Sequence, residues 1–82
     1  MILETFSSGP FDTNTYILGC SETKEACIID APPECSKEVQ RRIKHLGLTA
    51  KMLLLTHSHL DHIADASLLK ESLDLPVFIH PL

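Results

Sequence analysis

The adjacent prolines Pro32 and Pro33 divide the sequence into two parts with different hydrophobic periods. Because proline lacks a backbone N–H and has a fixed φ, neither the interior of a strand nor that of a helix continues through this pair. Before the prolines, three short runs rich in apolar and β-branched residues are separated by turn residues. They predict strands at Ile2–Ser7, Thr15–Leu18 and Ala26–Ile29. The short connections between these strands favour an antiparallel meander.

After the prolines, the sequence alternates between helical and strand patterns. Apolar residues at helical spacing predict a first helix from Ser36, as its N-cap, to Gly47, as its C-terminal stop. The following elements are predicted as a strand, a helix and a strand, at Lys51–Thr56, Ile63 or Ala64 to Leu73, and Val77–His80. This order predicts an α/β fold with parallel pairing among the later strands. The continuous apolar runs Ala26–Ile29 and Met52–Leu55 predict strands that are covered on both faces.

The length of 82 residues allows one domain with a thin core, and we assign residues 1–82 to a single or partial domain. The net charge of −4 gives no reason to expect a nucleic acid or a membrane surface as partner. Three basic side chains, Lys37, Arg41 and Lys44, fall on one face of the first predicted helix. Such a face either contacts a phosphate-bearing ligand or is the solvated side of an amphipathic helix, and we favour the solvated side.

The three cysteines are an odd number, which does not favour a disulfide scaffold. The residues Met1 to Glu4 also lack the basic stretch and apolar core of a secretory signal. We therefore expect reduced thiols and a cytoplasmic location.

Three histidines and one aspartate follow the predicted fourth strand directly, in the run Thr56-His57-Ser58-His59-Leu60-Asp61-His62. His57 and His59 are two residues apart, so in an extended backbone their side chains point to one side and can bind the same ion. Asp61 and His62 follow where the chain bends toward the next helix, and they can address a second point. Mixed nitrogen and oxygen donors suit zinc, with iron or manganese as alternatives. The carboxyl end of a strand is also where open α/β folds bind ligands.

This run, called the signature run below, resembles the HxHxDH signature of the metallo-β-lactamase-fold hydrolases, and among them the glyoxalase II-like thioesterases. Further similar stretches are Thr13-Asn14-Thr15-Tyr16, Ile28-Ile29-Asp30, Leu54-Leu55-Thr56 and Leu75-Pro76-Val77-Phe78-Ile79-His80. The resemblance implies that the chain is the N-terminal part of an αββα sandwich, with an antiparallel meander followed by β-α-β-α-β order.

The resemblance also implies roles for the signature run. His57 and His59 would bind a first metal ion, and Asp61 and His62 a second, with zinc as the expected metal at both. Asp61 is in addition the candidate catalytic residue. A hydroxide activated by the metal would attack an ester, thioester or related bond of a small-molecule substrate.

Three further residues are singled out by their positions. Asp30 matches an acidic family position at a strand end, where it either orients a ligand or holds the loop, or else caps the turn before Pro32. Asp65 stands near the start of the second predicted helix, in a stretch where the family commonly has small residues. It either interacts with that helix dipole or disturbs the turn as an additional acceptor. His80 matches a family position usually outside the metal shell, and we assign it no role.

Family members carry a further histidine for the first metal, a bridging aspartate and a histidine for the second metal downstream of the signature, beyond Leu82. We therefore expect a truncated hydrolase that is weakly active or inactive without a missing C-terminal portion. The alternative is a non-catalytic module that self-associates as a homo-oligomer and holds a partial metal site.

Overall fold

The structure is a computed structural model that describes residues 1–10, 12–56 and 65–79. These residues form β1 (Ile2–Ser8), β2 (Thr13–Gly19), β3 (Glu25–Ile29), α1 (Ser36–Leu46), β4 (Thr49–Leu55), α3 (Ala66–Leu73) and β5 (Val77–Ile79). The α/β class and the predicted alternation of strands and helices are confirmed. The predicted start of the second helix at Ile63 or Ala64 lies outside the described residues, as does His80.

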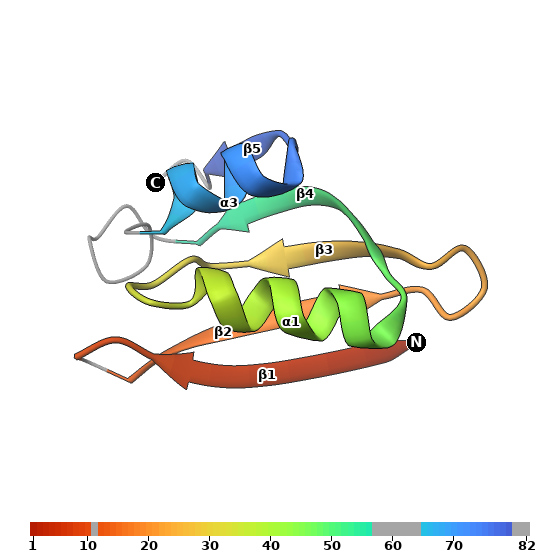
Figure 1. The fold of residues 1–82 in the computed structure, drawn as a ribbon, viewed down its shortest axis with the longest axis horizontal. Coiled ribbons are helices and arrows are strands. Elements are labelled where there is room, and N and C mark those ends of the chain that lie inside the picture. The colour runs from red at the N-terminus through yellow and green to blue at the C-terminus, as the bar shows by residue number, and fades with distance from the viewer. Residues whose placement is uncertain (11, 57–64, 80–82) are drawn as a thin grey trace.

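The strands form one sheet in the order β1-β2-β3-β4-β5 (Figure 1). β1, β2 and β3 pair antiparallel, whereas β3 pairs with β4 and β4 with β5 in parallel. The predicted meander and the predicted parallel pairing are both confirmed. The two helices cross between parallel strands, and both lie on the same face of the sheet (Figure 1).

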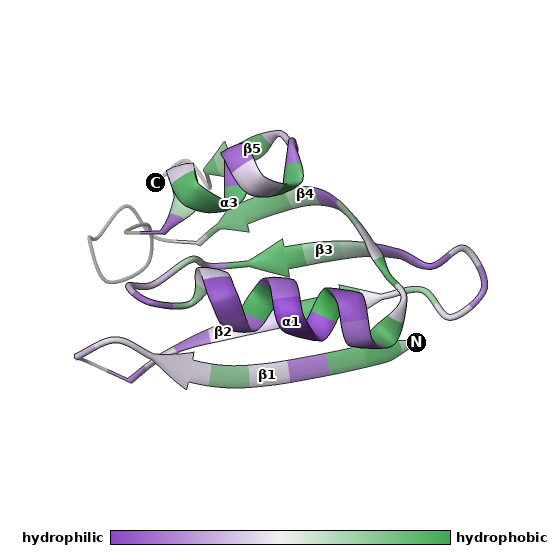
Figure 2. Ribbon diagram, viewed as in Figure 1, coloured by the Kyte–Doolittle hydropathy of each residue, from purple (hydrophilic) through white to green (hydrophobic). Residues whose placement is uncertain are grey.

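The core lies between this covered face and the two helices. Ile17, Ile28 and Leu53, one from each of three neighbouring strands, are fully buried there. They pack in one cluster with Val39 of α1 and Leu69 of α3. Figure 2 shows the same division on α1, where hydrophilic and hydrophobic residues alternate along the helix. The amphipathic pattern that predicted α1 therefore also determines how the helix lies on the sheet.

The other face of the sheet has an apolar surface that neither α1 nor α3 covers. Side chains alternate between the two faces of a strand, so the strand neighbours of the core residues point to this side. We call it the open face; it comprises Leu3, Tyr16, Leu18, Cys27, Ile29, Met52, Leu54 and Phe78. Leu3 is 60% exposed and Phe78 50% exposed, while Met52 and Leu54 are half-buried. The prediction that Ala26–Ile29 and Met52–Leu55 are covered on both faces is therefore wrong for two residues of each run, because Cys27, Ile29, Met52 and Leu54 are only half-buried.

The ends of α1 differ in how well the sequence predicted them. Gly47 has a φ of 68°, in the left-handed region that glycine adopts easily, and the predicted C-terminal stop is confirmed. The predicted N-cap is wrong, because Ser36 is the first helical residue and Cys35 occupies the N-cap position without a side-chain cap. Lys37, Arg41 and Lys44 are exposed on this helix, as its predicted amphipathic pattern requires.

The three cysteines are free thiols, and they are exposed, half-buried and buried at Cys20, Cys27 and Cys35, respectively. In the part of the chain that the structure describes, neither helix is long and apolar enough to cross a lipid bilayer.

Candidate functional site

The signature run begins where β4 ends, at the carboxyl end of a strand inside the sheet (Figure 1). The four predicted metal ligands, His57, His59, Asp61 and His62, lie outside the described residues, so their roles stay predictions. The structure does describe Thr56 immediately before the ligands and Asp65 shortly after them. We call residues 57–64 the ligand-bearing segment, after the predicted ligands in it. The contacts of Thr56 and Asp65 show how the fold holds the residues at its two ends.

Asp30 holds the first end. It follows β3 with a φ of 67°, a left-handed conformation that aspartate tolerates better than most residues. Its carboxylate accepts hydrogen bonds from the backbone N–H of Thr56 at 2.8 Å and from the Thr56 hydroxyl at 2.7 Å. The Asp30 N–H donates to the carbonyl oxygen of Leu54 at 2.9 Å, and Asp30 is only 4% exposed. Of the alternatives for Asp30, these contacts favour holding the start of the loop.

Asp65 holds the second end. Its N–H donates to the carbonyl oxygen of Ala31 at 2.9 Å, and its carboxylate accepts a hydrogen bond from the N–H of Ser36, also at 2.9 Å. The carboxylate therefore interacts with the N-terminus of α1, 29 residues earlier, and makes no side-chain cap on its own helix α3. The expected interaction with a helix dipole exists, but the helix is α1.

The charge of Asp65 also affects a neighbouring thiol. Burial, followed by the proximity of the Asp65 carboxylate, raises the pKa of the Cys35 thiol to about 12. Both effects disfavour a thiolate, the first through loss of solvation and the second through repulsion between like charges. Cys35 therefore stays protonated at neutral pH, and a buried thiol of this kind is not a nucleophile.

Both ends of the ligand-bearing segment thus attach to one short stretch, residues 30–36, which we call the anchoring segment. Thr56 binds Asp30, whereas Asp65 binds Ala31 and Ser36. The sequence reasoning identified both aspartates but missed Ala31 and Ser36 as partners. The available signal was the placement of a charged residue, Asp65, where the resembling family commonly has small residues.

A hollow of about 410 Å³ opens beside the start of the signature run. Thr56 and Asp30 line it together with Asp12, Thr13, Asn14, Tyr16 and Ile29. It lies at the end of the sheet where β3 and β4 finish and β2 begins. The stretch around Thr13–Tyr16 that resembled the family therefore borders the same end of the sheet as the signature run.

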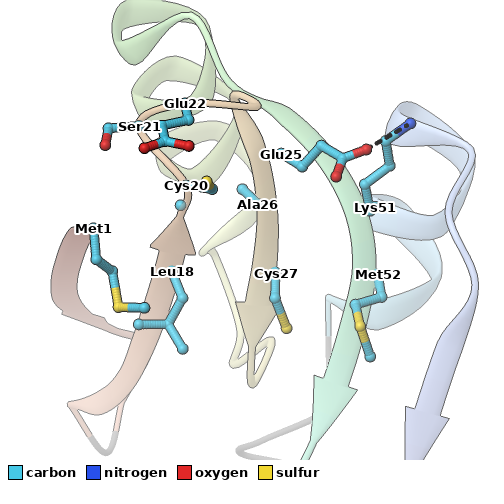
Figure 3. A pocket seen from close by; sticks show the side chains of 11 residues that line it. Met1, Leu18, Cys20, Ser21, Glu22, Glu25, Ala26, Cys27, Lys51 and Met52 are labelled. Atoms are coloured by element: carbon cyan, nitrogen blue, oxygen red, sulfur yellow. Dashed lines mark ion pairs between the residues drawn. The ribbon is translucent and has the colours of Figure 1, made fainter.

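A second hollow, of about 620 Å³, lies at the opposite end of the sheet, beside the β2–β3 turn (Figure 3). Leu18, Cys27 and Met52 of the open face lie next to one another in it, and Glu25 pairs with Lys51 at 3.8 Å above them. Hydrogen bonds from Thr23 lower the pKa of the exposed Cys20 thiol at its rim to about 7. None of the described residues that line this hollow is a histidine. The hollow is an uncovered part of the open face.

Within residues 1–10, 12–56 and 65–79, no group of three or more histidine, cysteine, aspartate or glutamate residues could hold a metal ion. A family model, described as the Metallo-beta-lactamase superfamily, matches residues 8–82. The chain belongs to this superfamily.

The chain is similar to two named bacterial proteins. The chain is 36% identical to the probable metallo-hydrolase YqgX of Bacillus subtilis, covering 88% of this chain and 33% of that protein. It is 37% identical to hydroxyacylglutathione hydrolase GloC of Haemophilus influenzae, and the match covers 95% of this chain and 36% of that protein. This chain therefore spans about a third of the length of these relatives.

The fold agrees with solved structures over nearly the whole chain. The BLEG-1 B3 metallo-beta-lactamase superposes with a TM-score of 0.87 at 32% identity, covering 96% of this chain and 37% of that one. TTHA1623, solved in a di-iron-bound form, superposes with a TM-score of 0.80 at 35% identity, and the match covers 96% of this chain and 38% of that one. The five-stranded sheet and its two helices thus form the N-terminal portion of the metallo-beta-lactamase fold.

The metal dependence of the superfamily fits the donors that this sequence offers. Three imidazoles and one carboxylate lie within residues 57–62, and such donors bind zinc or iron. The described residues are consistent with this fit, because hydrogen bonds with the anchoring segment hold Thr56 and Asp65 on either side of the donors.

Proposed function

We propose that this chain carries the first half of a two-metal site in a hydrolase that acts on an ester, a thioester or a related bond. The observation that carries this proposal is the placement of the signature run. It begins at the carboxyl end of β4, and the buried carboxylate of Asp30 holds the residue before its first histidine. The relatives named as a metallo-hydrolase and as a hydroxyacylglutathione hydrolase support the reaction class.

In this proposal His57 and His59 hold the first metal ion, while Asp61 and His62 hold the second. Asp61 is also the proposed catalytic residue of the set. Zinc is the proposed metal, and the di-iron-bound TTHA1623 makes iron the first alternative to test. When bound, such ions lower the pKa of water and stabilise negative charge that develops on a carbonyl oxygen. Asp30 and Asp65 hold the two ends of the ligand-bearing segment.

The proposed substrate is a small molecule with a thioester bond, and a hydroxyacyl thioester of glutathione is the first compound to assay. This choice follows the name of the Haemophilus influenzae relative. A cytoplasmic location suits such a substrate, and the three free thiols agree with a reducing compartment. For the 82-residue chain alone we expect weak or no hydrolysis, because it offers each ion two ligands and a catalytic zinc has three.

The metal ligands are tested by equilibrium dialysis of the chain against Zn²⁺, followed by elemental mass spectrometry. We expect His57→Ala and His59→Ala to lose first-site metal, because removing one of two ligands leaves a single weak donor. His45→Ala is the matched control, since His45 is an exposed imidazole near the end of α1, far along the chain from the signature run. Equal metal content in all three variants and in the original chain contradicts the ligand assignment.

A second candidate function, a non-catalytic module that self-associates, is supported by the open face. An apolar sheet surface of this kind favours association, and two copies facing each other would pool their partial metal sites. Light scattering of the purified chain tests this candidate, with Leu18→Lys/Met52→Lys as a variant that charges the open face. A concentration-dependent dimer that the double substitution dissociates is the expected result. A monomer at every concentration rules this candidate out.

A further inference from the structure

Asp65 is a junction between three parts of the fold. Its carboxylate accepts from the N–H of Ser36 in α1, its N–H donates to Ala31 in the anchoring segment, and its carbonyl oxygen accepts from the N–H of Leu69 in α3. Asp65 is 8% exposed and Ser36 also 8% exposed, so protein groups rather than bulk water satisfy these atoms. A buried carboxylate is tolerated in a protein when it has such partners.

The first turn of α1 needs the acceptor that Asp65 provides. The first N–H groups of a helix have no partner within the helix, and a side chain at the N-cap usually accepts one of them. Cys35 at the N-cap makes no such bond. The Asp65 carboxylate supplies the acceptor from a distant part of the chain, and its negative charge also suits the positive end of the helix.

The position of these bonds matters for the segment between Thr56 and Asp65. Thr56 is held by Asp30 and Asp65 by Ala31, and these partners are consecutive residues with Cα atoms about 3.8 Å apart. Thr56 and Asp65, which flank residues 57–64, are therefore held at neighbouring points of the anchoring segment. Fixing both ends of a loop reduces the number of conformations that its residues can adopt.

We propose that Asp65 is a positioning residue for the ligand-bearing segment, which it arranges by fixing the segment's second end to the N-terminus of α1. The proposal rests on the proposed function for the identity of the metal ligands, whereas the hydrogen bonds of Asp65 do not depend on it. Asp65 itself is not a metal ligand in this proposal, because its carboxylate is directed to Ser36. Arranging the ligands beforehand strengthens metal binding, because less conformational freedom is lost when the ion binds.

Two variants and one control test this proposal. Asp65→Ala removes the acceptor for Ser36, whereas Asp65→Asn keeps a side-chain oxygen at the same position. Ser36→Ala is the control, because it keeps the Ser36 N–H and removes only the hydroxyl that accepts from Gln40. Each variant of the full 82-residue chain is titrated with Co²⁺ and followed by visible absorption. In parallel, amide hydrogen exchange of the metal-free chain is measured for peptides covering residues 57–64 and for peptides from β1 to β3.

We expect Asp65→Ala to weaken Co²⁺ binding at least tenfold and to speed exchange in residues 57–64 at least tenfold, while β1 to β3 keep their protection. At saturating Co²⁺ its absorption spectrum should equal that of the original chain, because the ligand set is unchanged. Asp65→Asn should restore affinity to within about threefold, since it restores the hydrogen bond. Ser36→Ala should behave like the original chain.

Several results would overturn the proposal. A changed Co²⁺ spectrum in Asp65→Ala would make Asp65 a ligand, and faster exchange throughout the sheet would make it a general stabiliser of the fold. Unchanged exchange in residues 57–64 would show that it holds nothing there. If the original chain binds no Co²⁺, the proposed function fails, and the exchange comparison alone decides whether Asp65 fixes the segment. If Asp65→Ala binds Co²⁺ as the original chain does, the proposed function stands and the positioning role fails.

Discussion

Neighbouring leucines on β4 differ sharply in their surroundings. Leu53 is fully buried between the sheet and the helices, whereas Leu54 is half-buried on the open face. Ile28 and Ile29 on β3 differ in the same way. Because side-chain type is the same within each pair, the difference comes from the connections: both crossover helices lie on one face of the sheet, as right-handed crossovers in one direction require.

On the β3 and β4 segments Ala26–Ile29 and Met52–Leu55, the open face is apolar like the covered face, and this explains why these two segments do not alternate in hydropathy. Continuous apolar strands are typical of sheets that are covered on both sides. The helices between residues 36 and 73 supply one cover. The chain spans 33% of its Bacillus subtilis relative, so relatives of this size have ample further chain with which to cover a second face. The strands of this chain suit such a second layer.

The largest expected effect is a loss of stability when a buried leucine of the covered face is shortened. Leu53→Ala should lower the free energy of unfolding by about 3 kcal/mol, because it removes buried methyl groups and leaves a cavity in the core. Leu54→Ala is the matched control and should lower the free energy of unfolding by less than about 1 kcal/mol, because Leu54 already contacts solvent. Urea denaturation followed by circular dichroism measures both values. Equal losses would mean that the open face is as well packed in solution as the core.

A smaller loss of stability is expected when the contact between Arg42 of α1 and strand β1 is removed. The Arg42 guanidinium lies 4.6 Å from the centre of the Phe6 ring and bonds to Glu4 at 3.1 Å. It also pairs with Glu38 on its own helix. Arg42→Ala should lower the free energy of unfolding by about 1 kcal/mol, because a partly buried cation–π contact and an ion pair are lost together.

Arg41→Ala is the control for Arg42→Ala. Arg41 also pairs with Glu38, but its side chain is 64% exposed and the pair joins residues of the same helix. We expect a smaller loss than for Arg42→Ala in the same urea experiment. A larger loss in Arg41→Ala would show that pairing within the helix, rather than contact with β1, stabilises α1. Hydrogen bonds from Arg41 and then Arg42 lower the pKa of Glu38 to about 2, so both pairs should persist at mildly acidic pH.

Much of this fold could be predicted from the sequence because its signals are local. Strand runs before Pro32, helical spacing after Ser36 and a glycine at the end of α1 each act within a few residues. The N-cap of α1 could not be predicted, because its acceptor comes from Asp65, 29 residues away. Burial on the two faces could not be predicted either, since it depends on which side the helices occupy.

The candidate site, like the fold, has a part that local sequence predicts and a part that depends on tertiary contacts. The signature run was recognisable because its three histidines and its aspartate are close in sequence, and the family model confirms the family that the run indicated. The roles of Asp30 and Asp65 were left open, since each depends on a tertiary contact: Asp30 with Thr56 and Asp65 with Ser36. A sequence places a carboxylate near a site, but only the fold shows which N–H group it binds.

The cysteines allow the two faces to be compared by alkylation, first in the chain without substitutions. Cys35 lies in the buried core, whereas Cys27 is half-buried on the open face and Cys20 is exposed. Burial raises the pKa of Cys27, and hydrogen bonds from Thr23 lower that of Cys20 to about 7. The thiolate is the reactive form, so the fraction of reactive Cys20 should rise through half-maximum near pH 7.

With iodoacetamide at pH 8 we therefore expect Cys20 to react first and Cys27 more slowly. Cys35 should react only after unfolding, since its pKa of about 12 and its burial both keep it protonated and inaccessible. Peptide mass spectrometry of timed samples gives the three rates. Cys27 is the informative thiol: if it is protected as strongly as Cys35 in the native chain and becomes reactive in Leu18→Lys/Met52→Lys, a second copy covers the open face. If Cys27 reacts at an intermediate rate in both, the open face contacts solvent.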